Sequence, residues 1–206
     1  RHALRLAGLA LGGCSVLPDR PYQESRRYAL APRRPQRNPP RGRGGPVLLV
    51  RSLRAAPGLD QRGLRSIGAE GQVSLAYWDE WAAPPADAAE AALRGWMADS
   101  GIFAAVVASG SRLSGDVVIE AELVRLEAVP TQGVARAALS VLALSDAARD
   151  LVGQARILAQ VLAEGSAPLA GDSPAAMAAA MEAALGEALA SLERSLRPTL
   201  ASSRRR

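Results

Sequence analysis

The chain has 206 residues, a net charge of +5, 49% hydrophobic residues and 3% aromatic residues. This hydrophobic content excludes a disordered chain, and the length suits one domain with flanking segments. A single cysteine excludes an internal disulfide and a thiolate metal cluster, and the single histidine, His2, lies in a segment that we expect to be removed. We therefore expect no metal, no cofactor and no catalytic triad.

Positive charge gathers at the two ends of the chain. Residues 1–45 contain ten arginines against Asp19 and Glu24, a net charge of +8, whereas residues 46–198 carry −6. The basic tail, residues 199–206, adds +3. A groove for nucleic acid needs basic charge on the folded surface, which this acidic central region does not supply. We therefore predict that nucleic acid is not a partner.

The N-terminus has the features of a secretory signal. A positively charged start at residues 1–5 precedes a short apolar run, residues 6–11, which falls well below the roughly 20 residues of a membrane span. The following Leu11-Gly12-Gly13-Cys14 resembles a lipobox, the cleavage site of bacterial lipoproteins. We predict that residues 1–13 are a signal peptide and that cleavage leaves Cys14 at the new N-terminus.

Cys14 is the predicted lipidation site. A thioether lipid and an acylated amine would hold the protein stably on a membrane, because several acyl chains anchor far better than one. The alternative is an ordinary buried cysteine in a short helix. The residue after Cys14 is Ser15. Resemblance to proteobacterial lipoproteins would link Asp at this position to retention at the inner membrane. We therefore expect the periplasmic side of the outer membrane, with the inner membrane as the alternative.

A Pro-, Arg- and Gly-rich segment, residues 14–45, follows and is predicted to be a tether. Closely spaced prolines favour an extended, solvated linker. Two alternatives remain: its arginines contact anionic headgroups, at about 1 kcal/mol each, or Arg41 to Gly45 binds RNA. Within the tether, Tyr28-Ala29-Leu30 is an apolar island and a candidate for docking on the domain.

The domain itself is predicted to span residues 46–198. Short apolar or alternating runs predict strands, and runs with an apolar face repeating every three to four residues predict helices. In 72–79, Val73, Leu75 and Tyr77 are expected to share a half-buried face. Residues 151–164 alternate only partly, and we predict a strand there despite their helix-forming composition. The predicted strands are 46–50, 64–69, 72–79, 102–108, 116–128 with a bulge near Val124, 135–145 and 151–164.

Two helices complete the prediction. The first is capped by Asp87 and runs to Asp99, and the second begins with Ser173 as N-cap and Pro174 in first position and ends at Pro198. Together the elements predict an α+β domain in which an antiparallel sheet carries two helices on one face, a two-layer sandwich.

Tyr77, Trp78 and Trp81 form an aromatic cluster in a chain that is poor in aromatics. Exposed at a sheet edge, they would serve as contacts for a partner protein or a lipid. The alternative places Tyr77 and Trp81 in the core and Trp78 on the opposite, partly wet face. The carboxylate pairs Asp79-Glu80 and Glu120/Glu122 are interpreted as a solvated face, because no nucleophile accompanies them.

From about Tyr28 to Pro198 the chain resembles the auxiliary lipoproteins of ABC-type transport systems, including those of paraquat-inducible and MCE (mammalian-cell-entry) lipid transport. The family's usual tryptophan corresponds to Trp81, whereas Ala83 replaces a common acid, Pro85 a common leucine, and Arg51 a small apolar residue. The order and spacing of the following segments carry the resemblance: Tyr28-Ala29-Leu30, Pro46-Val47-Leu48-Leu49-Val50, Leu59-Asp60-Gln61-Arg62 and Tyr77-Trp78-Asp79-Glu80-Trp81-Ala82 before Pro84-Pro85.

The resemblance implies a membrane-anchored periplasmic subunit that scaffolds or docks an MCE-domain protein and an ABC permease/ATPase complex. It implies no enzymatic activity, and the sequence contains no G-x-x-x-x-G-K-[S/T] nucleotide loop. An alternative function is a lipid-binding carrier or envelope-assembly lipoprotein that holds an acyl chain between helices and sheet. A nucleic-acid-binding protein using the arginine-rich arm is the remaining class.

Overall fold

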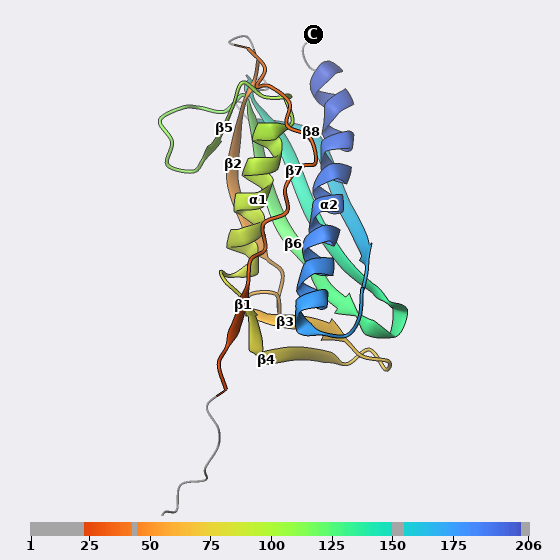
Figure 1. Cartoon of the computed structure of the whole chain (residues 1–206). Helices are drawn as coiled ribbons and strands as arrows, with labels where there is room; N and C mark the ends of the chain where they lie inside the picture. The colour runs from red at the N-terminus through yellow and green to blue at the C-terminus, as the bar shows by residue number, and fades with distance from the viewer. Residues whose placement is uncertain (1–22, 43–44, 150–154, 203–206) are drawn as a thin grey trace, which may run out of the picture.

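The computed structural model describes residues 23–42, 45–149 and 155–202 (Figure 1). The predicted signal peptide, Cys14 and the arginines of the basic tail lie outside the described residues. The strands are β1 Arg26–Tyr28, β2 Val47–Ala55, β3 Gly63–Ile67, β4 Val73–Trp81, β5 Ala105–Ala108, β6 Val117–Val129, β7 Val134–Arg149 and β8 Ala155–Pro168, and the helices are α1 Pro85–Asp99, the 3₁₀ turn η1 Pro130–Gln132 and α2 Pro174–Ser202.

The eight strands form one mixed sheet. Strands β6, β7 and β8 pair antiparallel, as predicted, but β2 lies parallel to both β5 and β6, and β1 lies parallel to β4. The prediction of a purely antiparallel sheet is therefore wrong. The chain between β2 and β5 contains the β3–β4 hairpin and α1, which is the long crossover that parallel neighbours need. Hydrophobic alternation within a strand carries no information about the direction of its neighbours.

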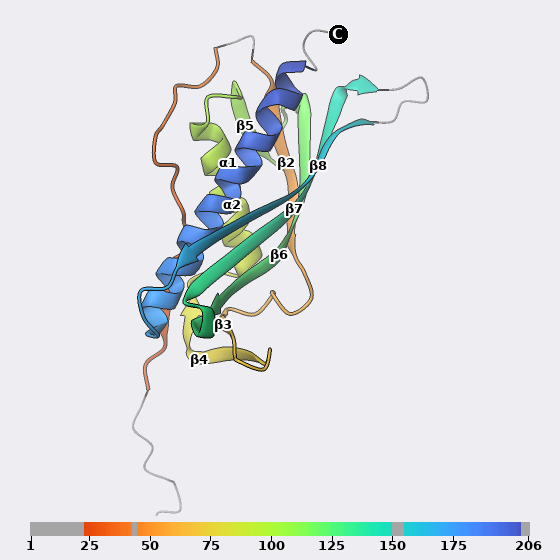
Figure 2. The ribbon, with the colours of Figure 1, turned by 90° about the vertical axis from the view of Figure 1, so that its right-hand side faces the viewer.

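Both helices cover the same face of the sheet, which confirms that part of the prediction (Figure 2). Helix α2 packs on β7 and β8, and α1 packs on β2 and β5. The core lies between helices and sheet. It is built from the inward residues of the central strands and the apolar faces of the helices, including Leu48, Ile119, Leu123, Leu139, Leu93, Met97, Met181, Leu185, Leu189 and Leu192.

Helix α2 begins as predicted and ends later than predicted. The Ser173 hydroxyl accepts a hydrogen bond from the backbone N–H of Ala176 (3.2 Å), and Pro174 is the first helical residue. The helix continues through Pro198 to Ser202. Pro198 removes one backbone hydrogen bond on the exposed side, while Leu196 and Leu200 are both buried and hold the last turns on the domain. Packing here outweighs the helix-breaking residue.

By length and composition, residues 174–201 of α2 are apolar enough to cross a membrane. The same properties are expected of a helix that lies in a protein core. The apolar stripe of α2 is fully buried from Met181 to Leu196 and the helix packs on the sheet, so in this structure it is part of the core.

Residues 151–164, predicted as a strand despite their helix-forming composition, form strand β8 from Ala155 onward. This confirms a strand over the described part of the segment. Its small residues Ala163 and Ala167 are buried beneath α2. The pairing of β6 with β7 shifts register between Leu123 and Arg125, which confirms the predicted bulge. Helix α1 begins at Pro85 rather than after Asp87, because a proline suits the first helical position.

Residues 26–38 of the predicted tether are largely exposed, yet they contact the domain at defined positions. Residues 26–28 form β1, which pairs with residues 79–81 of β4, and Leu30 is buried, as expected for a docking island. The chain then runs along the crevice between α1 and α2 (Figure 1). We call residues 30–38 the strap.

Candidate functional site

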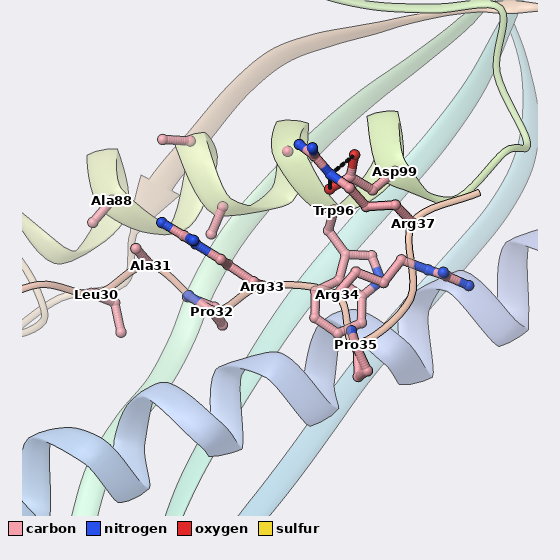
Figure 3. A pocket seen from close by; sticks show the side chains of 13 residues that line it. Leu30, Ala31, Pro32, Arg33, Arg34, Pro35, Arg37, Ala88, Trp96 and Asp99 are labelled. Carbon is pink, nitrogen blue, oxygen red and sulfur yellow. Dashed lines mark hydrogen bonds and ion pairs between the residues drawn. The ribbon is translucent and has the colours of Figure 1, made fainter. Parts of the chain in front are cut away.

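The strap lies over the two helices and, together with α1, forms a concave surface (Figure 3). Near its start, Pro32 rests against α2 at Gly186: a Cβ on this glycine would lie 3.4 Å from the Pro32 Cβ and 3.8 Å from the Trp96 ring. These are ordinary van der Waals distances, so the strap and the indole of α1 pack close to α2 here without requiring glycine at position 186.

Glu193 on α2 joins the strap to both helices. Its carboxylate accepts two hydrogen bonds from the Arg34 guanidinium of the strap (2.9 and 3.1 Å) and one from the Trp96 Nε1–H of α1 (2.9 Å). Arg197, one turn later on α2, donates a further bond (3.2 Å). Glu193 is buried, and the two-pronged Arg34 contact is the geometry in which an arginine binds a carboxylate most strongly.

The electrostatics of this cluster follow from those contacts. Burial alone raises the pKa of Glu193, but hydrogen bonds from Arg34, Arg197 and Trp96 together outweigh it, so the pKa of Glu193 lies below its usual value. The same hydrogen bond from Arg34 to Glu193 raises the pKa of Arg34. Both groups are therefore charged at neutral pH, and the cluster acts as an ionic latch. We call Arg34, Trp96, Glu193 and Arg197 the latch.

The C-terminal part of the strap is fixed to the end of α1. The Asn38 backbone N–H donates to the Asp99 carbonyl (2.9 Å), and its side-chain amide donates to the Ser100 carbonyl (3.1 Å). The Arg37 guanidinium pairs with the Asp99 carboxylate (3.0 Å). Gly101 has a φ of +71°, and a Cβ there would lie 2.9 Å from the Asn38 Cβ, so the turn after α1 requires glycine.

A groove of about 740 Å³ opens between the strap and α1. Its α1 wall consists of small residues, and its strap wall carries guanidinium groups (Figure 3). Small residues let another chain approach closely, and guanidinium groups attract carboxylates and phosphates. Asp99 is the one acid among the described residues that line it, and it is paired with Arg37. The lining comprises Leu30, Ala31, Pro32, Arg33, Arg34, Pro35, Arg37, Ala88, Ala91, Ala92, Gly95, Trp96 and Asp99.

The groove is suited to binding rather than to acid–base chemistry. Its described lining contains neither a nucleophile beside a base nor a pair of carboxylates. Across residues 23–42, 45–149 and 155–202, no three His, Cys, Asp or Glu side chains converge as a metal site requires. We regard the groove as the candidate functional site.

The structure separates the three aromatic candidates. Trp81 is 2% exposed and belongs to the core, whereas Tyr77 is 82% and Trp78 37% exposed. The rings of Tyr77 and Trp78 pack edge to face with centroids 4.7 Å apart. The core hypothesis therefore holds for Trp81 and is wrong for Tyr77.

The predicted inward face of β4 is also exposed, since Val73 and Leu75 are 49% and 39% accessible. Strand β3 pairs with β4 at Gly63 and Glu80 and then, after an irregularity, at Arg65 and Leu75. The β3–β4 hairpin joins β6 of the sheet through the pair Ser66 and Ala128. The side chains alternate as predicted, but no layer of the described residues covers this face.

Asp79 is buried, which corrects its interpretation as part of a solvated face. It accepts hydrogen bonds from the Tyr28 hydroxyl (2.9 Å) and the Arg26 guanidinium (2.9 Å). Burial, and then the hydrogen bond to Asp79, raise the pKa of Tyr28, while the same carboxylate raises the pKa of Arg26 through its hydrogen bond. These contacts, with those of Glu80, fix β1 on β4.

The remaining predicted carboxylates lie on the sheet face away from the helices. Glu80 pairs with Arg27 (2.9 Å), and Glu120 pairs with Arg51 (2.7 Å). Glu122 is exposed. Apart from Asp79, the interpretation of these acids as a solvated face agrees with the structure, since Glu80 and Glu120 are partly exposed and Glu122 is exposed.

Sequence reasoning missed the latch. A signal was present at Glu193, which comes four residues after Leu189 and three before Leu196 in the apolar stripe of α2. This spacing places a carboxylate on the buried face of the helix, where it needs a partner. Nothing local at Arg34 distinguished it from the other arginines of the tether.

The chain is similar to a known protein family and to two solved structures. Residues 28–192 match the family described as the ABC-type transport auxiliary lipoprotein component. A crystal structure of a Xanthomonas campestris protein of the DUF330 family shares 23% identity, covers 87% of this chain and 99% of its own, and has a TM-score of 0.72. A second, of an uncharacterized protein, shares 16% identity over 84% of this chain and 99% of its own, with a TM-score of 0.64. At these identities the two structures establish the fold alone. No curated protein matches the chain.

Proposed function

The chain belongs to the family of ABC-type transport auxiliary lipoprotein components, and on that premise we propose that it is a docking subunit of an ABC/MCE-type lipid transport system. The family establishes an auxiliary component of a transport system at a membrane. The finer proposal has this subunit scaffold an MCE-domain protein and its permease/ATPase complex on the periplasmic side. The observation that carries it is the groove between strap and α1, which lies within the matched residues.

Membrane attachment through Cys14 is part of this proposal. The lipobox-like Leu11-Gly12-Gly13-Cys14 supports an acylated N-terminus, and Ser15 favours the outer membrane. Several acyl chains would make the attachment stable. Intact-mass measurement of the purified full chain tests it: cleavage before Cys14 with added acyl mass is expected, and an unmodified chain that retains residues 1–13 would contradict it.

The docking role is supported by the chemistry of the groove walls. The α1 wall presents Ala88, Ala91 and Gly95, which permit a close approach of another backbone, and the strap wall presents Arg33 beside the Arg37–Asp99 pair. Such a surface fits an extended or helical protein segment that carries acidic side chains. We infer that an acidic segment of the MCE-domain partner occupies the groove.

Site-specific photo-crosslinking tests the docking role in the native envelope. A photoreactive phenylalanine analogue at position 91, which is exposed on α1 and lines the groove, is expected to crosslink the MCE-domain partner. Position 183, an exposed alanine on α2 outside the groove lining, serves as the matched control. Equal crosslinking at both positions, or an MCE-domain protein at neither, would argue against this site.

A lipid carrier is the second candidate function, and packing disfavours it. A carrier would hold an acyl chain between helices and sheet, where Leu139, Leu185 and Leu189 already lie fully buried in one cluster. Native mass spectrometry separates the two functions. Non-covalent lipid at a fixed stoichiometry would favour the carrier, and protein that carries only its covalent acyl chains favours the scaffold.

A further inference from the structure

Exposed hydrophobic side chains concentrate on the β3–β4 hairpin. Of the seven large hydrophobic residues exposed in the described parts of the chain, four lie within six residues of β4. We call these four, Val73, Leu75, Tyr77 and Trp78, the hairpin cluster. Side chains of this size on a monomer surface mark a contact with something apolar when they are contiguous.

The hairpin cluster lies at the end of the molecule where the chain enters the domain. Figures 1 and 2 both place the β3–β4 hairpin at the end from which β1 starts, whereas the C-terminus of α2 and the loop between β5 and β6 lie toward the other end. Nine peptide units separate Cys14 from Gln23, the first described residue. Fully extended, they span at most about 30 Å. The entry end of the domain is therefore restricted to a narrow zone above any bilayer that holds Cys14.

We propose that the hairpin cluster inserts at the boundary between the headgroups and the acyl chains of the bilayer to which Cys14 is anchored. The inference rests on the proposed acylation of Cys14. A tyrosine and a tryptophan with aliphatic neighbours are the residues that settle at a membrane–water boundary. The groove proposed for the protein partner lies instead on the strap and α1.

The charges beside the cluster favour the same occupant. Asp79 and Glu80 follow directly in β4, but Arg26 and Arg27 of β1 neutralise them with ion pairs of 2.8 and 2.9 Å. The strand end therefore presents aromatic rings beside compensated charge, which lowers the cost of approaching a headgroup layer. Glu70 remains exposed in the hairpin turn, beyond the cluster.

Tryptophan fluorescence tests the contact directly. The chain has three tryptophans, and Trp81 and Trp96 are buried, so Trp78 is the one that a lipid can reach. The acylated full chain is reconstituted in vesicles of phosphatidylethanolamine and phosphatidylglycerol, with or without bromine on the acyl chains. Because bromine quenches an indole only at contact, we expect brominated vesicles to reduce the emission by up to about a third, the share of one tryptophan in three.

Two variants assign the loss of emission. Trp78→Phe should abolish the difference between brominated and plain vesicles, and Tyr77→Ser should reduce it while the acylated protein still floats with the vesicles. Leu113→Ser is the matched control, because Leu113 is equally an exposed hydrophobic residue but lies in the loop between β5 and β6. It should leave the quenching unchanged.

Failure of the anchor and failure of the inference give different results. Protein that is acylated and floats, yet emits equally in both vesicle types, overturns membrane insertion and leaves the anchor intact. An unmodified mass and no flotation overturn both. Insertion is also overturned, in favour of a protein contact, if the parent protein emits equally in both vesicle types and Trp78→Phe no longer binds the MCE-domain partner.

Discussion

Replacing Glu193 by glutamine removes one negative charge from the point where the strap, α1 and α2 meet. The Glu193 side chain is 7% exposed and that of Arg34 is 15% exposed, so neither charge is well solvated. Glutamine keeps the shape and one acceptor oxygen, but it leaves the Arg34 guanidinium without a countercharge. We expect the folded state to lose stability and the strap to lose its attachment to α2.

The structure sets the size of this loss. Removing one partner of a buried ion pair costs about 3–5 kcal/mol. Because glutamine keeps one acceptor oxygen, we expect Glu193→Gln to lower the free energy of unfolding by about 3 kcal/mol. Arg197 is half exposed, so its contact with Glu193 adds little. For a chain of this length, each kcal/mol lowers the melting temperature by about 2–4 °C, so a decrease of about 6–12 °C is expected.

Calorimetry of the full chain at neutral pH measures the effect, with Glu187→Gln as the matched control on the same helix. Glu187 pairs with Arg194 at 3.0 Å, but both side chains are more than half exposed, so its loss should cost less than about 1 kcal/mol. Trypsin should also cleave after Arg33 faster in Glu193→Gln than in Glu187→Gln. Equal melting temperatures in the two variants would refute the reasoning that the latch is a buried, stabilising pair.

Three further predictions follow from the same structure. The lowered pKa of Glu193 means that its contribution to stability is complete above its unfolded pKa of about 4.3 and is lost as the pH falls through the lower folded value, so urea midpoints should decline in acid less steeply in Glu193→Gln than in the parent. Gly165→Ala should destabilise strongly, because a Cβ there would lie 2.2 Å from the α2 backbone, whereas Gly95→Ala in α1, with open space around it, should stabilise by about 0.5–1 kcal/mol in urea unfolding. Trp81→Ala should cost about 3–5 kcal/mol and Trp78→Ala less than about 1, and comparable losses would contradict the separation of core and surface tryptophans.

Local sequence patterns predicted most of the strands and both helices, because the patterns follow from which face of each element is buried. The helix N-cap at Ser173, the bulge after Leu123 and the buried island at Leu30 were all visible as residue types at the right spacing. Strand direction was not visible. Pairing of β2 with β5 and β6 depends on contacts between residues about 60 positions apart, and alternation within a strand is the same in either direction.

The candidate site was harder to predict for a related reason. The arginines of the strap looked like a solvated linker because their partners, Glu193 and Asp99, lie about 160 and 60 residues away in the chain. Charge and proline content describe what a segment is able to do alone. Charge and proline content do not show that the Glu193 carboxylate lies on the buried face of a helix far along the chain. Conversely, Val73 and Tyr77 alternate as in a core strand, although both are exposed in the part of the chain that the structure describes.

Docking of residues 26–42 changes what the N-terminal segment does for an anchored protein. A free spacer over residues 14–45 would let the domain move as far as about 100 Å from the membrane. With β1 paired to β4 and the strap held by the latch, nine peptide units separate Cys14 from Gln23, and the reach is at most about 30 Å. With Cys14 acylated, the chain that tethers the protein also positions it, because the hairpin end is held near the bilayer. The strap and α1 extend from that end toward the other (Figure 1), so the groove that they line would run away from a bilayer holding the hairpin end. On the proposed acylation of Cys14 and insertion of the hairpin cluster, a partner that docks there would be met at a defined height and orientation, which a scaffold needs and a freely diffusing carrier does not.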